Sequence, residues 1–340
     1  MSRRPLFLFF SLFALILSLV SCTRGKKSEV PELVIYTYSS FTSEWGLQPK
    51  VIPPFEKECH CKVRVVGTED TGAMLNRLLL EGEKTKADVV IGIDNSLAHK
   101  ALDGNLLLAY QPAGLSNVPE ELLFDKSFRL IPFDYSYYAI IYDSEKLPNP
   151  PRSLRELANP LYRRKIILED PRTSTPGLGF LLWSVGVFGE KYLEFWHSLK
   201  PNILTISPGW DMAYGMFTKG EAPMVLSYIT SPAYHRIHEK SERYKAALFS
   251  EGHYLQIEGA GIVASTDQLE LARKFIDYLL SVSFQQYVPL HNYMFPVNRK
   301  TPLPEAFTKL PMPKKTILLP PEQVRQSLDR WFQEWRAALQ

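Results

Sequence analysis

The chain has 340 residues, of which 45% are hydrophobic and 22% are charged. This is the composition of a globular protein, and the length exceeds what one hydrophobic core usually organises, so two lobes are expected. The formal net charge is +3, and setting aside the basic residues at positions 3 and 4 leaves 37 basic against 36 acidic residues. A chain with nearly equal numbers of basic and acidic residues does not show the excess of positive charge that is typical of nucleic-acid-binding proteins.

The N-terminus has the pattern of an export signal. A basic pair precedes an apolar run over 5–20, which is shorter than the about 20 apolar residues of a membrane-spanning helix. The run ends in Ser21-Cys22, and a small residue before a cysteine resembles the lipobox of bacterial lipoproteins. The resemblance implies a signal peptide over 1–21, lipidation of Cys22 and a polar tether over 22–31. An uncleaved anchor and a simple secretory signal are the alternatives.

Two further cysteines, Cys59 and Cys61, flank His60. An exported protein can form disulfides, but a Cys-x-Cys bridge closes a small strained ring, so the sequence leaves this pairing open. A metal site built on these residues would need a fourth ligand and wider spacing.

The first part of the chain predicts a parallel sheet. Strand patterns over 33–38, 62–66 and 87–94 alternate with helical patterns. The first helix is expected to include Trp45 and to be interrupted near Pro53-Pro54. Ligand-binding residues lie at the carboxyl ends of parallel strands, although packing explains an aromatic residue there equally well. These ends hold Tyr38, Trp45, Asp70, Thr71 and Asp94.

The remaining elements suggest how two lobes are connected. A long aromatic strand over 131–142 and a return strand over 254–264 are expected to cross between them. A strongly amphipathic helix is predicted over 269–288, and a final helix over 321–339 carries Trp331 and Trp335 as a packing stripe. The expected division is lobe 1 over 32–132 and 259–305, lobe 2 over 133–258 with crossovers near 133–138 and 253–258, and a C-terminal helical segment over 306–340.

Two strand-to-helix turns in the second lobe share one pattern. In the stretch 170–177, Thr175 suits the helix N-cap and Pro176 the first helical position. Thr230-Ser231 before Pro232 repeats the arrangement. Free N–H groups and the helix dipole make such starts suitable for an anion, but an ordinary capped helix has the same pattern.

The candidate ligand-binding residues are of two chemical kinds. Aromatic rings with a carboxylate suit a flat organic cation, at about 0.5–2 kcal/mol per cation–π contact. Hydroxyls at helix starts suit an alcohol or a phosphate. The first kind comprises Tyr38, Trp45, Asp70, Trp210, Tyr228, Tyr234 and Tyr293. The second comprises Ser174, Thr175, Thr230 and Ser231.

Several separate blocks resemble, in order, the thiamine-binding proteins of bacterial thiamine ABC transporters. The blocks span about 33–300, and the resemblance is specific because many separate blocks occur in the same order as in the family. Cys59 and Cys61 also have counterparts in the family. They are 36–41 with Trp45, Glu69-Asp70, 75–78, 86–95, 170–179, Gly209-Trp210, 226–228, 230–235 and 250–256.

The resemblance implies an α/β fold of the two-lobed type II periplasmic binding protein class, each lobe a mixed sheet flanked by helices, with the ligand in the cleft. It implies a binding protein and not an enzyme, without cofactor or metal. Its transported ligands would be thiamine, thiamine phosphate and thiamine diphosphate, and its partners an ABC permease and its ATPase. The lipobox departs from a freely soluble form and implies lipid anchoring in the periplasm or on the outer face of the cell membrane.

The resemblance also implies the ligand positions. Thr71 and Ile229 stand where other members carry other residues, so their contacts are expected through the backbone alone. The implied set is Tyr38, Trp45, Asp70, Thr71, Ser174, Thr175, Trp210, Tyr228, Ile229, Thr230, Ser231, Tyr234 and Tyr293.

Two other functions on the same fold are weighed. A ferric-ion carrier uses neighbouring tyrosines, and Tyr137-Tyr138 could be mistaken for them, but they are expected mid-strand with no histidine beside them. A thiaminase-like enzyme needs a cysteine nucleophile in the cleft. Cys59 and Cys61 are instead expected at the opposite end of their strand.

Overall fold

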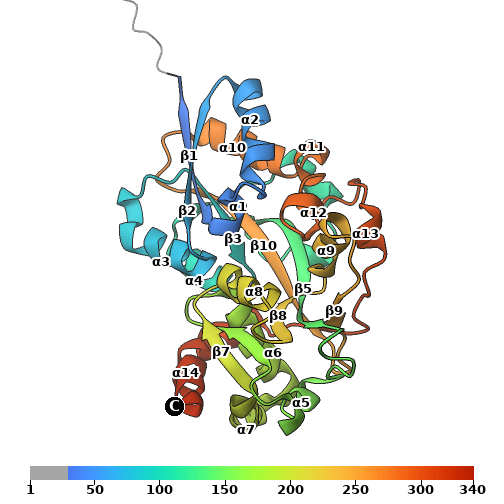
Figure 1. Cartoon of the computed structure of the whole chain (residues 1–340). Coiled ribbons are helices and arrows are strands. Elements are labelled where there is room, and N and C mark those ends of the chain that lie inside the picture. The colour runs from blue at the N-terminus through green and yellow to red at the C-terminus, as the bar shows by residue number, and fades with distance from the viewer. Residues whose placement is uncertain (1–29) are drawn as a thin grey trace, which may run out of the picture.

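A computed structural model describes residues 30–340. The expected signal peptide, Cys22 and nearly all of the expected tether lie outside the described residues. Within 30–340, none of the helices has both the length and the apolar character that a membrane span requires. Figure 1 shows two lobes, with strands β5 and β10 running between them.

The first lobe, uppermost in Figure 1, is built from two distant parts of the chain, because the orange helices α10 to α12 pack beside the blue helix α2. Its strands are β1 (Glu32–Tyr38), β2 (Lys62–Thr68), β3 (Val89–Asp94), β4 (Leu107–Leu108) and β11 (Phe295–Pro296). Its helices are α1 (Ser39–Thr42), α2 (Gln48–Cys59), α3 (Thr71–Glu81), α4 (Ala98–Asp103), α10 (Leu269–Leu279), α11 (Val282–Gln285) and α12 (Val288–His291).

The second lobe lies below it and ends with the red helix α14, next to the C-terminus. Its strands are β6 (Ile166–Glu169), β7 (Ile203–Ser207), β8 (Met224–Tyr228), β9 (Tyr244–Ala247) and β12 (Thr316–Ile317). Its helices are α5 (Leu154–Leu157), α6 (Thr175–Phe188), α7 (Tyr192–Leu199), α8 (Trp210–Thr218), α9 (Pro232–His238), α13 (Glu305–Thr308) and α14 (Pro321–Leu339).

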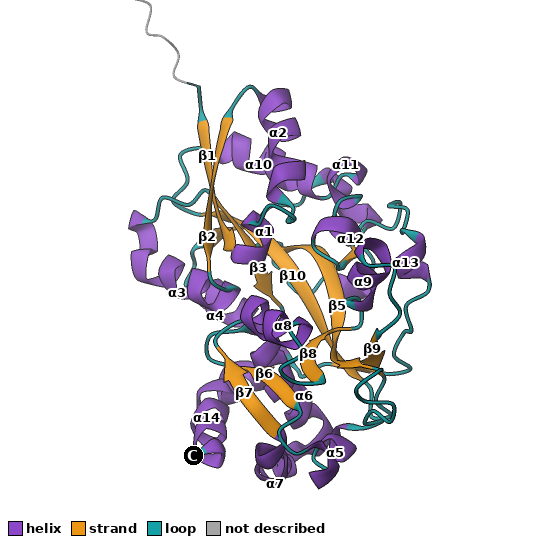
Figure 2. Ribbon diagram, viewed as in Figure 1, coloured by secondary structure: helices purple, strands orange, loops and turns teal. Residues whose placement is uncertain are grey.

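Strands β5 (Ile131–Asp143) and β10 (His253–Val263) belong to both lobes. The strand order is β2-β1-β3-β10-β5-β8-β6-β7, and Figure 2 shows this sheet (orange) flanked by helices (purple). β1 pairs in parallel with β2 and β3, as the sequence predicts. β10 pairs antiparallel with β3 and β5, so the sheet is mixed. The first half of β5 pairs with β10 and its second half with β8.

The expectation for the first helix is wrong in two respects. Trp45 lies in a turn before α2, and α2 continues through Pro53 and Pro54 without interruption. Each proline removes a backbone donor. The buried face of α2 still holds the helix in place, and on it Phe55 packs edge-on against Phe275 of α10 with ring centroids 5.0 Å apart.

The single helix expected over 269–288 is also wrong, whereas the final helix is confirmed. α10 ends at Leu279, and the Ser281 hydroxyl accepts a hydrogen bond from Phe284 N to cap a new helix, α11. A serine cap competes with continued helix at such a position. In α14, Trp331 and Trp335 are buried, and Trp335 packs edge-on against α7.

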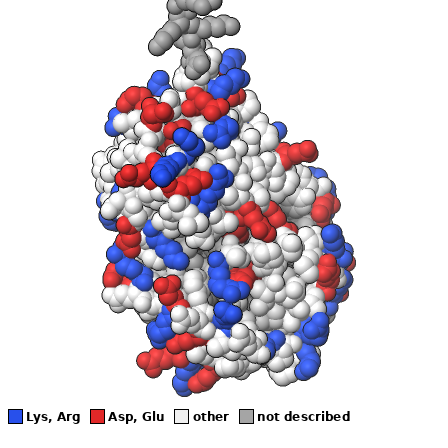
Figure 3. All heavy atoms as spheres, turned by 90° about the vertical axis from the view of Figure 1, so that its left-hand side faces the viewer, with Lys and Arg blue, Asp and Glu red and all other residues white. Residues whose placement is uncertain are grey.

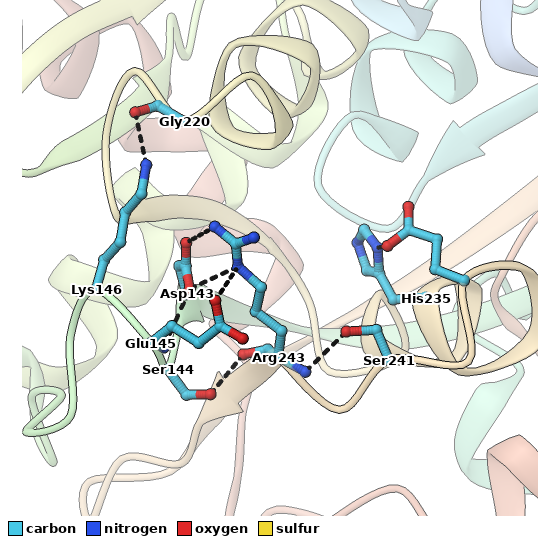
Figure 4. Close-up of polar contacts among 9 residues, drawn as sticks. Asp143, Ser144, Glu145, Lys146, Gly220, His235, Ser241 and Arg243 are labelled. Atoms are coloured by element: carbon cyan, nitrogen blue, oxygen red, sulfur yellow. Dashed lines mark hydrogen bonds and ion pairs between the residues drawn. The ribbon is translucent and has the colours of Figure 1, made fainter.

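A buried ion pair fixes the far end of β5 (Figure 4). Arg243 donates to both carboxylate oxygens of Asp143, at 2.9 Å and 2.6 Å. The Asp143 side chain is 3% exposed and that of Arg243 is 34% exposed. Burial raises the pKa of Asp143, but the hydrogen bonds from Arg243 outweigh burial, so the net pKa is below the ordinary value. The pair therefore stabilises the fold above the unfolded-state pKa and loses this effect as the pH falls through the folded-state pKa.

We expect Asp143→Asn to lower the free energy of unfolding by about 1.5–3 kcal/mol at pH 7, because it removes a charged partner from a mostly buried pair. Chemical denaturation measures this loss. The loss should stay constant down to about pH 4 and shrink only below it, where Asp143 becomes protonated in the unfolded chain.

The matched control is Glu120→Gln, which breaks an exposed pair with Lys126 at 3.8 Å. It should change stability by less than about 0.5 kcal/mol. A loss in Asp143→Asn that has already disappeared at pH 5 would contradict the electrostatic explanation.

Candidate functional site

A cavity of ≈ 440 Å³ lies between the lobes. Its volume falls within the about 300–1,000 Å³ of small-molecule sites. The first lobe contributes the end of β1, helix α1 and the start of α3, and the second lobe contributes α8, β8 and α9. The cavity-lining residues that the sequence predicts are Tyr38, Trp45, Asp70, Thr71, Thr175, Trp210, Tyr228, Ser231, Tyr234 and Tyr293.

Three of the expected ligand residues are buried behind the lining: Ser174, Ile229 and Thr230. The Thr230 hydroxyl lies 3.1 Å from that of Ser136. Ser174 is the N-cap of α6, although its side chain makes no capping hydrogen bond. The expectation that Thr175 is the cap is therefore wrong, because Thr175 is already helical and donates its N–H to Asp70.

The wall on the second-lobe side is held by a chain of contacts behind it. Trp210 stacks on Tyr214, with centroids 5.0 Å apart and planes 21° apart, and donates from Nε1 to Ser227 at 2.7 Å. The Tyr214 hydroxyl lies 2.9 Å from Nε2 of buried His235, whose Nδ1 lies 2.8 Å from Glu239. Burial lowers the pKa of His235, and Glu239 partly offsets this effect. The indole of Trp210 is thus fixed in orientation before a ligand arrives.

The rim of the cavity is aromatic and joins the two lobes. Tyr293 lies between Trp45, at 6.2 Å between centroids, and Tyr234, at 5.2 Å. Its hydroxyl lies 2.8 Å from Nε2 of His238 on α9. Tyr293 has a φ of +54°, which costs a bulky residue about 1–3 kcal/mol and is typical of functional sites.

Hydrogen bonds cross directly from one lobe to the other. Asp70 Oδ1 accepts from Thr71 N at 2.7 Å, as a helix cap, and from Thr175 N of the second lobe at 3.3 Å. Ser39 Oγ donates to Asp211 Oδ2 at 2.6 Å. Burial raises the pKa of Asp70 to about 6, although these backbone donors lower it. The structure is therefore a closed arrangement, and Asp70 both caps a helix and joins the lobes.

Buried carboxyl groups gather around the inner wall. Within residues 30–340, none of them forms an ion pair with Lys or Arg. Burial raises the pKa of Asp94 to about 7, and raises those of Asp134, Glu169 and Glu258 well above their ordinary values. Of these four, Glu258 lines the cavity. Their raised pKa values favour the neutral acids, and a positive charge in the cavity would stabilise the ionised form of the acids beside it.

Sequence reasoning missed several cavity-lining residues. Ser39 directly follows the first strand and Asp211 follows Trp210, so their positions were a usable signal. Glu258 was signalled by a charge inside an apolar strand. The missed residues are Ser39, Ser40, Glu69, Pro176, Asp211, Tyr214, Gly215, Thr218, His238, Glu258, Asn292 and Met294.

Tyr137 and Tyr138 do not form a metal-binding pair. Neighbouring strand residues point to opposite faces. The Tyr138 hydroxyl is buried and donates to Thr175 O at 3.2 Å, while that of Tyr137 lies 3.2 Å from Thr316 Oγ1. The part of the chain that the structure describes contains no group of three or more His, Cys, Asp or Glu able to hold a metal.

The two cysteines of the first lobe are free thiols away from the cavity. Cys61 directly precedes β2, whose other end, Thr68, pairs with Tyr38. Neither cysteine is among the described residues that line the cavity. A cysteine nucleophile in the cleft, which a thiaminase-like mechanism needs, is therefore not provided by these two residues.

The chain matches the model of the bacterial extracellular solute-binding proteins over residues 84–319. It is 49% identical over 332 residues to the thiamine-binding periplasmic protein of Brucella abortus biovar 1 (strain 9-941). The matched region covers 97% of this chain and 97% of that relative. It is 45% identical to that of Escherichia coli (strain K12) over 310 residues, covering 91% of this chain and 94% of the relative.

The chain belongs to the bacterial extracellular solute-binding proteins, in the family of the thiamine-binding periplasmic proteins. A solved structure of a periplasmic thiamin binding protein has a TM-score of 0.87 and 43% identity, and covers 92% of this chain and 97% of its own. The type II periplasmic binding protein fold is thereby confirmed. The apo ferric ion-binding protein A of Pasteurella haemolytica, at 18% identity and a TM-score of 0.73, covers 91% of this chain and 98% of its own and shares the fold alone.

We expect Asp94→Asn to stabilise the protein above neutral pH. Asp94 Oδ1 accepts from Ser96 N and Leu97 N, which Asn can reproduce, while its buried Oδ2 has no partner within residues 30–340. A raised folded-state pKa means that the stability contributed by Asp94 is complete below the unfolded-state pKa and is lost as the pH rises through about 7.

Chemical denaturation at pH 8 should therefore show a gain of about 1–3 kcal/mol for Asp94→Asn, and the gain should shrink as the pH falls and vanish only below about pH 4. The control is Asp329→Asn on the exposed face of α14, which should change stability equally little at both pH values. A destabilised Asp94→Asn variant at pH 8 would show that the Asp94 carboxylate is required for the fold.

Proposed function

We propose that this chain is the extracytoplasmic solute-binding component of an ABC importer and captures thiamine, thiamine phosphate and thiamine diphosphate for a permease and its ATPase. The observation that carries the proposal is the cavity lining, which combines aromatic rings with Glu69, Asp70, Asp211 and Glu258. No Lys or Arg is among the described residues of that lining. Such a site suits a flat aromatic ligand with a fixed positive charge, and thiamine carries one on its thiazolium ring.

Each pole of the ligand has candidate partners. The thiazolium charge is assigned to Asp70 and Glu258, and the rings to the aromatic walls formed by Tyr38, Trp45, Trp210, Tyr228, Tyr234 and Tyr293. Thr71, Thr175 and Ser231 are assigned to polar groups of the ligand, including the phosphate of an ester. Ser174, Ile229 and Thr230 act from behind the lining by holding these segments.

The cellular setting is part of the proposal. The relatives are named as periplasmic binding proteins, and lipidation of Cys22 would hold this chain at the outer face of a membrane. On the face shown in Figure 3, basic and acidic side chains are interspersed, which offers no continuous positive surface for nucleic acid. Binding without catalysis is supported by the relatives' names and by the position of the two free thiols away from the cavity.

We expect purified protein to bind thiamine with one-to-one stoichiometry in titration calorimetry. Burial of the half-exposed Trp45 at the rim should also change the intrinsic fluorescence. A neutral aminopyrimidine without the thiazolium ring serves as the control ligand and should bind far more weakly. Absence of heat with thiamine and with both phosphate esters would contradict the proposal.

We expect Asp70→Asn to weaken thiamine binding without loss of stability. Asn keeps the acceptor for Thr71 N and Thr175 N and caps about as well as Asp, so the closed geometry is preserved. Removal of a buried charged contact is worth about 1.5–3 kcal/mol, or about one to two decades in Kd. Calorimetry and thermal melting measure the two effects.

Glu69→Gln is the matched control, because Glu69 also lines the cavity but is exposed. It should bind thiamine almost as the wild type does. An Asp70→Asn affinity within about twofold of wild type would reduce Asp70 to a capping and lobe-joining role.

A further inference from the structure

Two carboxyl groups face each other where β10 and β5 cross from one lobe to the other. Glu258 and Asp134 are directly opposite in the antiparallel register. Opposite residues share one face of a sheet, with Cβ atoms about 4.5–5.5 Å apart. Glu258 is 6% exposed, and Asp134 is fully buried. Within the described part of the chain, neither forms an ion pair with a basic residue.

Neutral groups supply few hydrogen bonds to this pair. The Tyr38 hydroxyl donates to Glu258 Oε2 at 2.9 Å, and Gln256 Nε2 donates to Oε1 at 3.2 Å. Asn292 Nδ2 donates to Asp134 Oδ2 at 2.5 Å and to the Tyr38 hydroxyl at 3.0 Å. Asp134 Oδ1 is buried and has no partner within residues 30–340. Two buried carboxylates this close, with one oxygen unpaired, cannot both remain charged at modest cost.

The surrounding elements add no positive charge. Asp94 at the end of β3 and Asp70 at the start of α3 add negative charge near Glu258. Tyr228 of β8 faces the same group of carboxyls. The ionisable groups around the pair are therefore acids or phenols, contributed by β1, β3, β8 and the turn before α3. A proton or a bound cation must supply the missing countercharge.

We propose that Glu258 and Asp134 together hold one proton in the ligand-free protein and release it to solvent when a cationic ligand enters the cavity. Glu258 lines the cavity, so the charge of the ligand can replace the proton beside it. The step breaks an O–H bond and transfers the proton to water or buffer. Burial, and then the charge of Asp134, raises the pKa of Glu258, in agreement with this assignment.

The inference rests on the proposed function for the identity of the cation, and it makes Glu258 a residue that determines specificity. A ligand with a fixed positive charge compensates the ionised pair, whereas a neutral ligand of the same shape leaves the proton in place. Thiamine affinity should consequently rise with pH, by up to about tenfold per pH unit for one released proton.

The first test is titration calorimetry with thiamine at pH 8, in buffers that differ in ionisation enthalpy. Asp70 and Asp94, with pKa values of about 6 and about 7, are then mostly ionised and release little. Wild type should release about one proton per thiamine, Glu258→Gln almost none, and the control Asp329→Asn, on the exposed face of α14, as much as wild type. No release by wild type would overturn the proposal, as would unchanged release in both Glu258→Gln and Asp134→Asn.

The second test needs no ligand and separates this inference from the proposed function. Infrared difference spectra of ligand-free wild type against Glu258→Gln at pH 8 should contain the C=O stretch of a protonated carboxylic acid. Absence of that band would overturn the proton assignment even if thiamine binds. Failure of thiamine to bind would instead refute the proposed function, and the band would still decide whether the pair holds a proton.

Discussion

The antiparallel pairing of β5 with β10 is the constraint on which the rest of the structure depends. Both strands pass through the junction of the lobes, so their hydrogen bonds set the position of one lobe against the other. The same pairing places Asp134 opposite Glu258 and sets Tyr138 beside Tyr228. A shift of one residue in this register would turn all these side chains to the opposite face.

The buried carboxyl groups around the cavity lower the stability of the fold. Buried carboxyl groups without basic partners destabilise a protein, and apolar residues of similar size would usually be more stable. Here they are concentrated around a cavity between the lobes, where a ligand can supply the missing charge. Strain in the backbone of Tyr293 at the rim is a second cost at the same place. Binding of a cation would offset the electrostatic cost, because its charge stabilises the ionised carboxyl groups.

Similarity of fold would not have separated the candidate functions. Ferric ion-binding proteins share this architecture at 18% identity, so the lobes and the crossing strands are compatible with different cargoes. The distinction lies in the side chains. Tyr138 is directed into the core by its bond to Thr175 O, and the histidine in the lining, His238, contacts Tyr293 instead.

Much of the site could be predicted because strand ends are visible in a sequence. Tyr38, Asp70 and Trp210 follow local patterns of strand, turn and helix start, and each lies in the cavity lining. Glu258 and Asn292 lie in segments far from these turns. The pairing of β10 with β3 and β5 positions Glu258, and Asn292 directly follows α12, just before β11 pairs with β5. No local pattern specifies which distant strands become neighbours.

The sequence by itself determined the α/β class, the parallel order of the first strands, the final helix and most of the aromatic lining, because each follows from periodicity or turn chemistry over a few residues. Tertiary structure decided what competing local preferences left open. It carried α2 through Pro53-Pro54 by packing its buried face, ended α10 before Ser281, and made Asp70 bind Thr175 of the other lobe. It also brought Glu258 and Asp134 together with no Lys or Arg partner among residues 30–340, because register and burial arise only when distant strands pair.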